Sequence, residues 1–278
     1  MPQGRTLGGA PANFTFQVNE LGGSGLLVSR VGDDDLGREA LALLAARGVD
    51  TTHVAVDPRH PTGTVLAELD PEGKATYRFP SDVAWDFMEA SPALAALASQ
   101  VDCVCFGSLA QRSAISSAAV QAFVQATPPE ALRIFDVNLR GDMYSRQVIE
   151  ASLGLATALK LSDEELPVLA RMFGLEGEEG TVLRALLTAH DLDLVAYTCG
   201  GAGSLLLTRD QEHRQPAMKV QVVDTIGAGD AFTSALALGL LAGHDLTAIN
   251  HHASAVAAAV CSMSGGMPPL PDALRLFA

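Results

Sequence analysis

Positive charge is scarce in this sequence, and long apolar runs are absent from it. Its 278 residues include 18 Lys and Arg against 32 Asp and Glu, a formal net charge of −14 at pH 7. Phosphate backbones require basic surface patches, so this balance argues against a nucleic-acid partner. A small phosphorylated ligand stays compatible with it, because such a ligand needs only a few local donors. Without about 18 uninterrupted apolar residues, the sequence predicts no membrane span and no membrane partner.

Cysteines are few, and their spacing matches neither a zinc site nor a redox motif. The four are Cys103, Cys105, Cys199 and Cys261, with no CxxC pair among them. We interpret them as buried thiols of a reducing compartment. The first residues, MPQGRTLGGAPANF, also lack the basic and then apolar pattern of a signal peptide. Together these features predict a cytoplasmic protein.

Short apolar runs alternate with amphipathic stretches along the chain. Hydrophobic residues make up 48% of the chain and charged residues 18%, which predicts a sizeable core. The alternation is typical of an α/β protein whose sheet is covered by helices on both faces. We expect strands at 25–31, 101–106, 132–137, 158–161, 194–198, 204–207 and 220–223. We expect helices at 12–21, 37–47, 113–125, 146–157, 163–173, 181–190, 228–241 and 246–262.

One segment interrupts the α/β pattern. Residues 64–69 and 75–79 alternate in polarity, and the letters DPEG between them are typical of a turn. The segment therefore predicts a β-hairpin inserted at about 62–80. Such an insertion could serve as a lid, as an interface or as decoration.

Residues 222–232, VVDTIGAGDAF, carry the strongest chemical signal. An apolar run leads into a turn of small residues, and a long Ala/Leu-rich helix follows. Backbone N–H groups at Gly227, Ala228 and Gly229 could approach an anion there, helped by the helix N-terminus. Asp230 lies in the first helical turn, where it could act as general base on a hydroxyl that attacks phosphorus. The alternative is that Asp230 caps its helix. No GxxxxGK[ST] motif is present, so any phosphate cradle here differs from a P-loop.

Two further glycine-rich turns could approach a ligand. In residues 8–13, GGAPAN, the exposed backbone of Gly8 and Gly9 and the amide of Asn13 could bond sugar hydroxyls. Pro11 also fits an ordinary helix start. Residues 198–203, TCGGAG, end a predicted strand and could approach nucleotide phosphates, although alone they indicate only a turn.

Polar residues also follow two other predicted strands. In open α/β sheets, ligands bind outside the carboxyl ends of the strands. Arg140, at the end of FDVNLR, is a candidate partner for a phosphate or hydroxyl. In KLSDEE, Ser162 and Glu165 fit a capping box. Glu165 could alternatively hold Mg²⁺ through water.

These five segments occur in one order that resembles the ribokinase/PfkB family of carbohydrate kinases, with the strongest likeness to its bacterial fructokinase-like branch. The resemblance spans nearly the whole chain. It implies one ribokinase-like domain over 1–278, a three-layer α/β/α sandwich with a mostly parallel sheet and a small β lid. It further implies ATP- and Mg²⁺-dependent phosphorylation of a monosaccharide, with fructose as first candidate. The alternatives are a kinase for 2-keto-3-deoxygluconate or a nucleoside.

The resemblance also assigns roles to residues. Asp230 corresponds to the catalytic base, and the backbone of Gly227, Ala228 and Gly229 to the anion hole. Gly9 and Asn13 correspond to sugar-binding positions, with Arg140 nearby. The nucleotide side comprises Ser162, Thr198, Gly200, Gly203, Asn250 and Ala253. Glu165 matches the glutamate that holds Mg²⁺ through water, and Asp224 and Ile226 neighbour the place of a monovalent cation such as K⁺.

The sequence departs from the family pattern in two places. Ser162 stands where many members have Asn. Only seven residues precede the GG motif, where the family has an additional strand and turn, so we expect that N-terminal strand to be missing. This departure motivates a third hypothesis, a truncated and catalytically impaired member that binds nucleotide. In some members the lid makes a dimer, so a homodimer through the hairpin is a further expectation.

Overall fold

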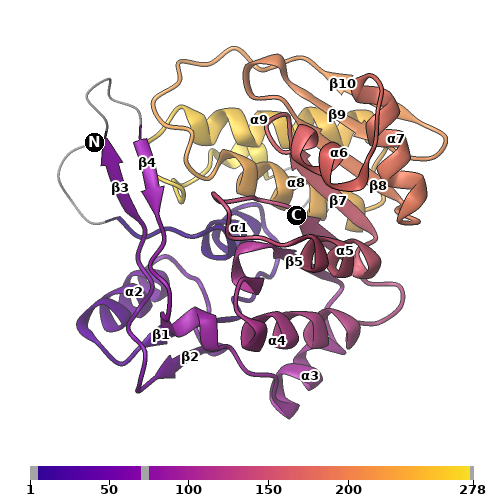
Figure 1. Cartoon of the computed structure of the whole chain (residues 1–278). Helices are drawn as coiled ribbons and strands as arrows, with labels where there is room; N and C mark the ends of the chain where they lie inside the picture. The colour runs from indigo at the N-terminus through magenta and orange to yellow at the C-terminus, as the bar shows by residue number, and fades with distance from the viewer. Residues whose placement is uncertain (1–5, 70–74, 276–278) are drawn as a thin grey trace.

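The computed structural model describes residues 6–69 and 75–275. Its centre is a six-stranded sheet in the order β10-β9-β8-β7-β6-β5 (Figure 1). The strands β5 to β8 are parallel, whereas β9 and β10 are antiparallel additions at one edge. The bounds are β5 Cys103–Gly107, β6 Leu132–Asp136, β7 Ala158–Ser162, β8 Leu194–Thr198, β9 Ser204–Leu207 and β10 Glu212–Gln215.

Helices cover both faces of this sheet, as the sequence predicts. On one face a core of Phe135, Leu159, Val195 and their neighbours packs against α4 to α7. On the other face Ile134, Ala196 and their neighbours pack against α8 and α9. Successive strand residues thus enter opposite cores, which explains why these strands are apolar throughout. The helices are α1 Ala10–Glu20, α2 Asp35–Ala46, α3 Pro92–Ala98, α4 Ala114–Gln125, α5 Arg146–Leu155, α6 Leu166–Phe173, α7 Glu179–Ala189, α8 Ala228–Leu241 and α9 Leu246–Cys261.

Two small sheets accompany the central one. Strands β1 (Ser29–Gly32) and β2 (Val54–Asp57) form a parallel pair. Strands β3 (Leu66–Leu69) and β4 (Ala75–Arg78) form an antiparallel hairpin that projects from the body at the left of Figure 1. The hairpin is present where the sequence predicts it, and its turn lies outside the described residues. Short 3-10 helices, η1 (Ala84–Phe87), η2 (Leu109–Gln111), η3 (Gly200–Ala202) and η4 (Asp272–Leu274), link other elements.

The predicted strand at 220–223 is wrong. The described backbone there forms no strand, and Val222 and Val223 are 61% and 60% exposed. Instead the N–H groups of Val223 and Asp224 both donate to the carbonyl of Cys261, at the end of α9. An apolar run with no neighbouring strand to pair with stays irregular, whatever its β propensity.

Three of the described α-helices and strands lie where the sequence predicts none: β2, β10 and α3. Strand β10 reads EHRQ, and it lies at the sheet edge, where polar residues are tolerated. Helix α3 is a seven-residue PALAALA segment capped by Ser91. In the part of the chain that the structure describes, no helix is long and apolar enough to cross a membrane.

Candidate functional site

The site lies where the N-termini of α1 and α8 meet the carboxyl ends of β6 and β7. Helices α1 and α8 pack against each other. Their contact brings the amide of Asn13 to Asp230, with 2.7 Å between Asn13 Nδ2 and Asp230 Oδ2. The GGAPAN and GAGD segments, 217 residues apart at this bond, are therefore one site. The residues that the sequence singles out for sugar binding and for base catalysis are in direct contact.

Asp230 is the third residue of α8, but it does not cap the helix. The N-cap position is Gly227, and no side chain forms a cap hydrogen bond there. The helix-cap alternative is therefore wrong. Burial raises the pKa of Asp230 to about 6, with the charge of Asp136 adding to the rise, while the Asn13 hydrogen bond and Lys160 oppose it. A carboxylate with such a pKa can accept a proton near neutral pH.

Close packing constrains the glycines at the start of α8, Gly227 most strongly. Gly227 has a φ of 78°, and a Cβ built on it would lie 2.6 Å from the Cα of Gly266. A Cβ on Gly229 would lie 3.1 Å from Nζ of Lys160. Without side chains at Gly227 and Gly229, a ligand can approach the backbone N–H groups of this turn closely, which suits an anion. The N–H of Ala228 donates to the carbonyl of Thr225 at 3.3 Å. None of the sequence motifs points to the loop with Gly266, after α9.

A buried ion pair lies below this turn, and sequence reasoning missed it. Nζ of Lys160 is 3.1 Å from Oδ1 of Asp136, and Thr233 Oγ1 donates to Oδ2 of the same carboxylate at 3.2 Å. Both charged side chains are 9% exposed. The carboxylates of Asp136, Glu165 and Asp230 raise the pKa of Lys160 despite its burial, so the ammonium stays charged. The available signal is a single lysine between apolar residues in the strand ALKLS.

Glu165 links the ends of β6 and β7. Its Oε1 accepts the N–H of Leu139 at 2.8 Å, and its Oε2 accepts the N–H of Ser162 at 2.7 Å. The predicted capping box is wrong, because Ser162 is the last residue of β7 and α6 begins at Leu166 with Glu165 as its N-cap. Beside Glu165 lies a cavity of about 210 Å³, lined by Leu139, Arg140, Gly141, Tyr144, Ser162, Glu164, Glu165 and Val168. Arg140 lines this cavity and is exposed, and its role toward a ligand stays a prediction.

The TCGGAG segment forms the turn between β8 and β9. Gly200 and Gly203 both have positive φ values, 46° and 103°. A Cβ on Gly203 would lie 2.0 Å from the carbonyl oxygen of Gln215, so only glycine fits. A cavity of about 470 Å³ adjoins the turn, lined by Asp163, Glu179, Tyr197, Cys199, Ala202, Ser204, Arg214, Gln215 and Pro216.

Asn250 and Ala253 lie on α9 and are both fully buried. Oδ1 of Asn250 accepts from Ser204 at 2.6 Å, and its Nδ2 donates to the carbonyl of His213 at 2.8 Å. The amide thus ties α9 to β9 and β10. Its place near an adenosine stays a prediction.

Asp224 holds two loops together. Its Oδ1 accepts from the N–H of Ile226, and its Oδ2 from the N–H of Gly265, both at 3.0 Å. Within the described residues, no group of three or more His, Cys, Asp and Glu is placed to hold a metal. A divalent cation at this site would therefore need water and ligand oxygens in addition to a protein carboxylate, and the buried carboxylate of Glu165 fits that demand.

The sequence is similar to a family of known proteins along nearly its whole length. The model of the pfkB family of carbohydrate kinases matches residues 3–273. A curated relative, a fructokinase of Klebsiella pneumoniae, is 34% identical over 253 residues, which cover 86% of this chain and 80% of the relative.

Solved structures agree with the sequence match. A sugar kinase of Pyrococcus horikoshii in complex with ATP has a TM-score of 0.80 and 30% identity, over 94% of this chain and 84% of that one. A fructokinase of Vibrio cholerae, in a form with fructose, ADP and calcium ion bound, has a TM-score of 0.78 and 26% identity, over 97% and 90%.

Proposed function

The chain belongs to the pfkB family of carbohydrate kinases, which makes it a phosphotransferase with an alcohol group as acceptor, and we propose that it transfers the γ-phosphoryl group of ATP to a hydroxyl of a monosaccharide. Fructose is the first candidate, since curated relatives at 31–34% identity are named fructokinase. Asp230 is the proposed general base.

The observation that carries this proposal is the setting of Asp230 in the first turn of α8. Its carboxylate has a pKa of about 6 and bonds to Asn13, while the bare amides of Gly227 and Gly229 stand beside it. A sugar held by Gly8, Gly9 and Asn13 would present its hydroxyl to this carboxylate. The proton passes to Asp230 as the hydroxyl oxygen bonds in line to the γ-phosphorus, while the bond from that phosphorus to the β,γ-bridging oxygen breaks and ADP leaves.

The transferring phosphoryl group gains negative charge on its oxygens and needs fixed positive partners. The amides of Gly227, Ala228 and Gly229 supply them from one side. The Lys160 ammonium lies under Gly229, and the exposed Arg140 borders the same region. These cations also offset the repulsion between Asp230 and a nearby phosphate, which a lone carboxylate would impose.

Glu165 would hold Mg²⁺ through water, and the bound ion would neutralise phosphate charge. Each oxygen of this carboxylate accepts one backbone N–H and keeps a further lone pair.

A monovalent cation such as K⁺ would lie beside Asp224 and Ile226. The turn with Thr198, Gly200 and Gly203 would face the nucleotide phosphates, near Ser162. Asn250 and Ala253 would lie by the adenosine.

The test is ATP turnover against a panel of fructose, other hexoses, 2-keto-3-deoxygluconate and a nucleoside. We expect fructose to give the highest kcat/KM and Asp230→Asn to lose at least about a thousandfold in kcat, consistent with the loss of a general base. The matched control is Asp272→Asn, because this side chain is 92% exposed. Unchanged turnover in Asp230→Asn would remove the proposed base. ATP binding without transfer to any sugar would instead favour an impaired member.

A further inference from the structure

Both legs of the β3–β4 hairpin meet the body at the short helix η1. The amide of Ala84 donates to the carbonyl of Pro61 at 2.8 Å, which ties η1 to the leg before β3. On the same leg, a Cβ built on Gly63 would lie 1.9 Å from Nε1 of Trp85. The indole of Trp85 therefore packs directly on the backbone of that leg. The orientation of η1 sets where the hairpin leaves the molecule.

Arg112 holds η1 and the second leg at the same time. Its Nε and Nη2 each lie 2.7 Å from one oxygen of Asp86, a bidentate pair. The guanidinium lies 4.4 Å above the ring of Trp85. Nη2 and Nη1 also donate to the carbonyls of Pro80 and Phe79, just after β4. With Arg112 and Asp86 only 11% and 6% exposed, water competes little for these bonds.

The same arginine reaches the loop that carries Arg140. Arg112 directly follows η2, after β5, and its Nη1 lies 3.2 Å from the sulfur of Met143. Met143 is three residues beyond Arg140, and its amide donates to the carbonyl of Arg140 at 3.0 Å. Arg112 therefore contacts the hairpin base and the ligand-side loop after β6 with one rigid group.

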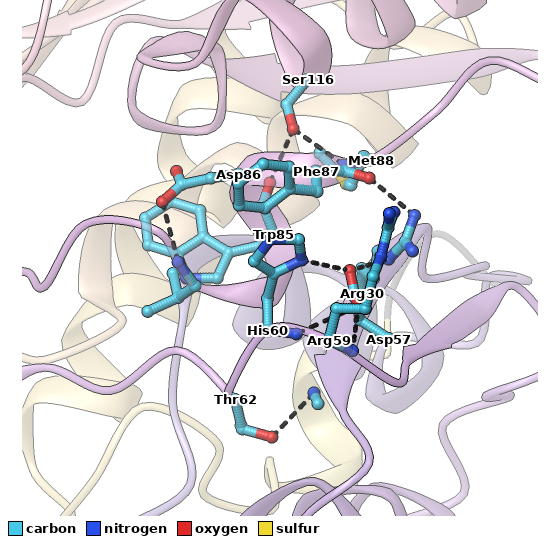
Figure 2. Close-up of polar contacts among 12 residues, drawn as sticks. Arg30, Asp57, Arg59, His60, Thr62, Trp85, Asp86, Phe87, Met88 and Ser116 are labelled. Atoms are coloured by element: carbon cyan, nitrogen blue, oxygen red, sulfur yellow. Dashed lines mark hydrogen bonds and ion pairs between the residues drawn. The ribbon is translucent and has the colours of Figure 1, made fainter.

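The other end of η1 is fixed independently, as Figure 2 shows. Arg30 of β1 donates to the carbonyl of Phe87 at 2.6 Å and pairs with the buried Asp57 of β2 at 2.9 Å. The ring of His60 stacks on Phe87 with 3.5 Å between centroids. Ser116 of α4 donates to the carbonyl of Trp85 and accepts the amide of Met88. With Phe87 anchored, a change at Arg112 would tilt η1 and the hairpin rather than detach them.

We propose that Arg112 is a positioning residue for phosphoryl transfer, which sets the hairpin base at a fixed distance from the loop with Arg140. This inference rests on the proposed function. The planar guanidinium serves a carboxylate, two carbonyls and an aromatic face at once. A lysine ammonium has neither the fork geometry nor the flat face, although it keeps the charge.

The experiment compares Arg112→Lys with Arg133→Lys in the full chain. Arg133 is the matched control, because it also donates to several backbone carbonyls, such as that of Leu155, but lies at the opposite end of β6. We expect Arg112→Lys to raise the KM for the sugar at least about tenfold, since misplacement by an ångström can cost far more. We expect the KM for ATP to stay within about twofold, and the fraction of ATP hydrolysed without sugar phosphorylation to rise. The control should change none of these.

Trp85 provides a second readout that does not need turnover. It is the single tryptophan of the chain, so selectively excited tryptophan fluorescence reports on η1. Sugar titration should change the emission of the wild type at lower sugar concentrations than that of Arg112→Lys. Should Arg112→Lys fail to fold, Asp86→Asn, which weakens the same pair, is expected to give the same rise in sugar KM.

The outcomes separate the two proposals. If the wild-type chain phosphorylates no sugar, the proposed function fails and this inference fails with it. If the wild type is active but Arg112→Lys and Arg133→Lys share the wild-type sugar KM, only the inference is overturned. A lower melting temperature of Arg112→Lys with an unchanged sugar KM would likewise overturn it, because that result describes a merely structural residue.

Discussion

Replacing Asp230 by Asn should make the protein more stable as well as inactive. The folded state raises the pKa of this carboxyl from 3.8 to about 6, chiefly through burial. A rise of about two units corresponds to about 3 kcal/mol at most, at 1.36 kcal/mol per unit, and the side chain's residual contact with solvent lowers that figure. An asparagine at the same position has no charge to desolvate, and its carbonyl oxygen can still accept the amide of Asn13.

The sign of this effect fixes its pH dependence. Below about pH 3.8 the carboxyl is protonated in both the folded and the unfolded chain, so the wild type pays no penalty. Between pH 3.8 and about 6 the unfolded chain has lost a proton that the folded chain still binds, so the stability of the wild type falls as the pH rises. Above about pH 6 the penalty is constant. The gap in unfolding free energy between Asp230→Asn and the wild type should therefore grow across this window and then level off.

Urea unfolding of both proteins at half-unit steps from pH 4 to pH 8 measures this gap. We expect a plateau of about 2–3 kcal/mol in favour of Asp230→Asn, with unchanged m-values. In parallel, kcat/KM of the wild type should fall about tenfold per pH unit below about pH 6, since it reports ionisation in the free enzyme. A gap that does not vary with pH, or a less stable Asp230→Asn at pH 7, would refute the reasoning about burial.

Three further predictions concern the same site. Asn13→Ala removes a hydrogen bond to the charged form of Asp230, so the acid limb of the kcat/KM profile should move to higher pH; an unmoved limb contradicts the assigned contact. Gly227→Ala puts a Cβ at a φ of 78° and against the backbone of the loop after α9, so thermal unfolding should show a loss of more than about 1 kcal/mol together with lost turnover. Lys160→Met leaves the buried carboxylate of Asp136 without its cation, and denaturant unfolding at pH 7 should show a loss of about 3–5 kcal/mol; a neutral effect would mean that the pair is dispensable.

Much of the fold is predictable from the sequence because local and global preferences agree. The strands at 194–198 and 204–207 and the helix at 228–241 have the predicted bounds. Strands buried between two helical layers must be apolar on both sides, and a long apolar helix needs no amphipathic period when it is packed all round. The failed strand at 220–223 shows the limit of this reasoning. An apolar run identifies a strand only where a neighbour exists to pair with it.

The parts of the candidate site that consist of backbone are predictable from the sequence. The parts that depend on contacts between single side chains are not. Glycine-rich turns at 8–9 and 227–229 leave a sequence signal, because Gly9 and Gly227 both have positive φ values, 118° and 78°, which favour glycine. The Asp136–Lys160 pair leaves almost none, since the two residues lie on different, mostly apolar strands and their contact depends on how those strands pair. The contacts of Arg112 leave no sequence signal either. They join it to Phe79 and to Met143, which lie about 30 residues before and after it in the sequence.

The hydrogen bond between Asn13 and Asp230 has a consequence for biosynthesis. The two residues are 217 positions apart, and a ribosome adds about 5–20 residues per second. Some 10–40 s therefore pass between the appearance of the first partner and that of the second. During that interval α1 lacks α8, the helix that brings Asp230 to Asn13. Catalytic competence is thus among the last properties that a nascent chain can acquire, and partly synthesised chains should neither bind the sugar productively nor consume ATP.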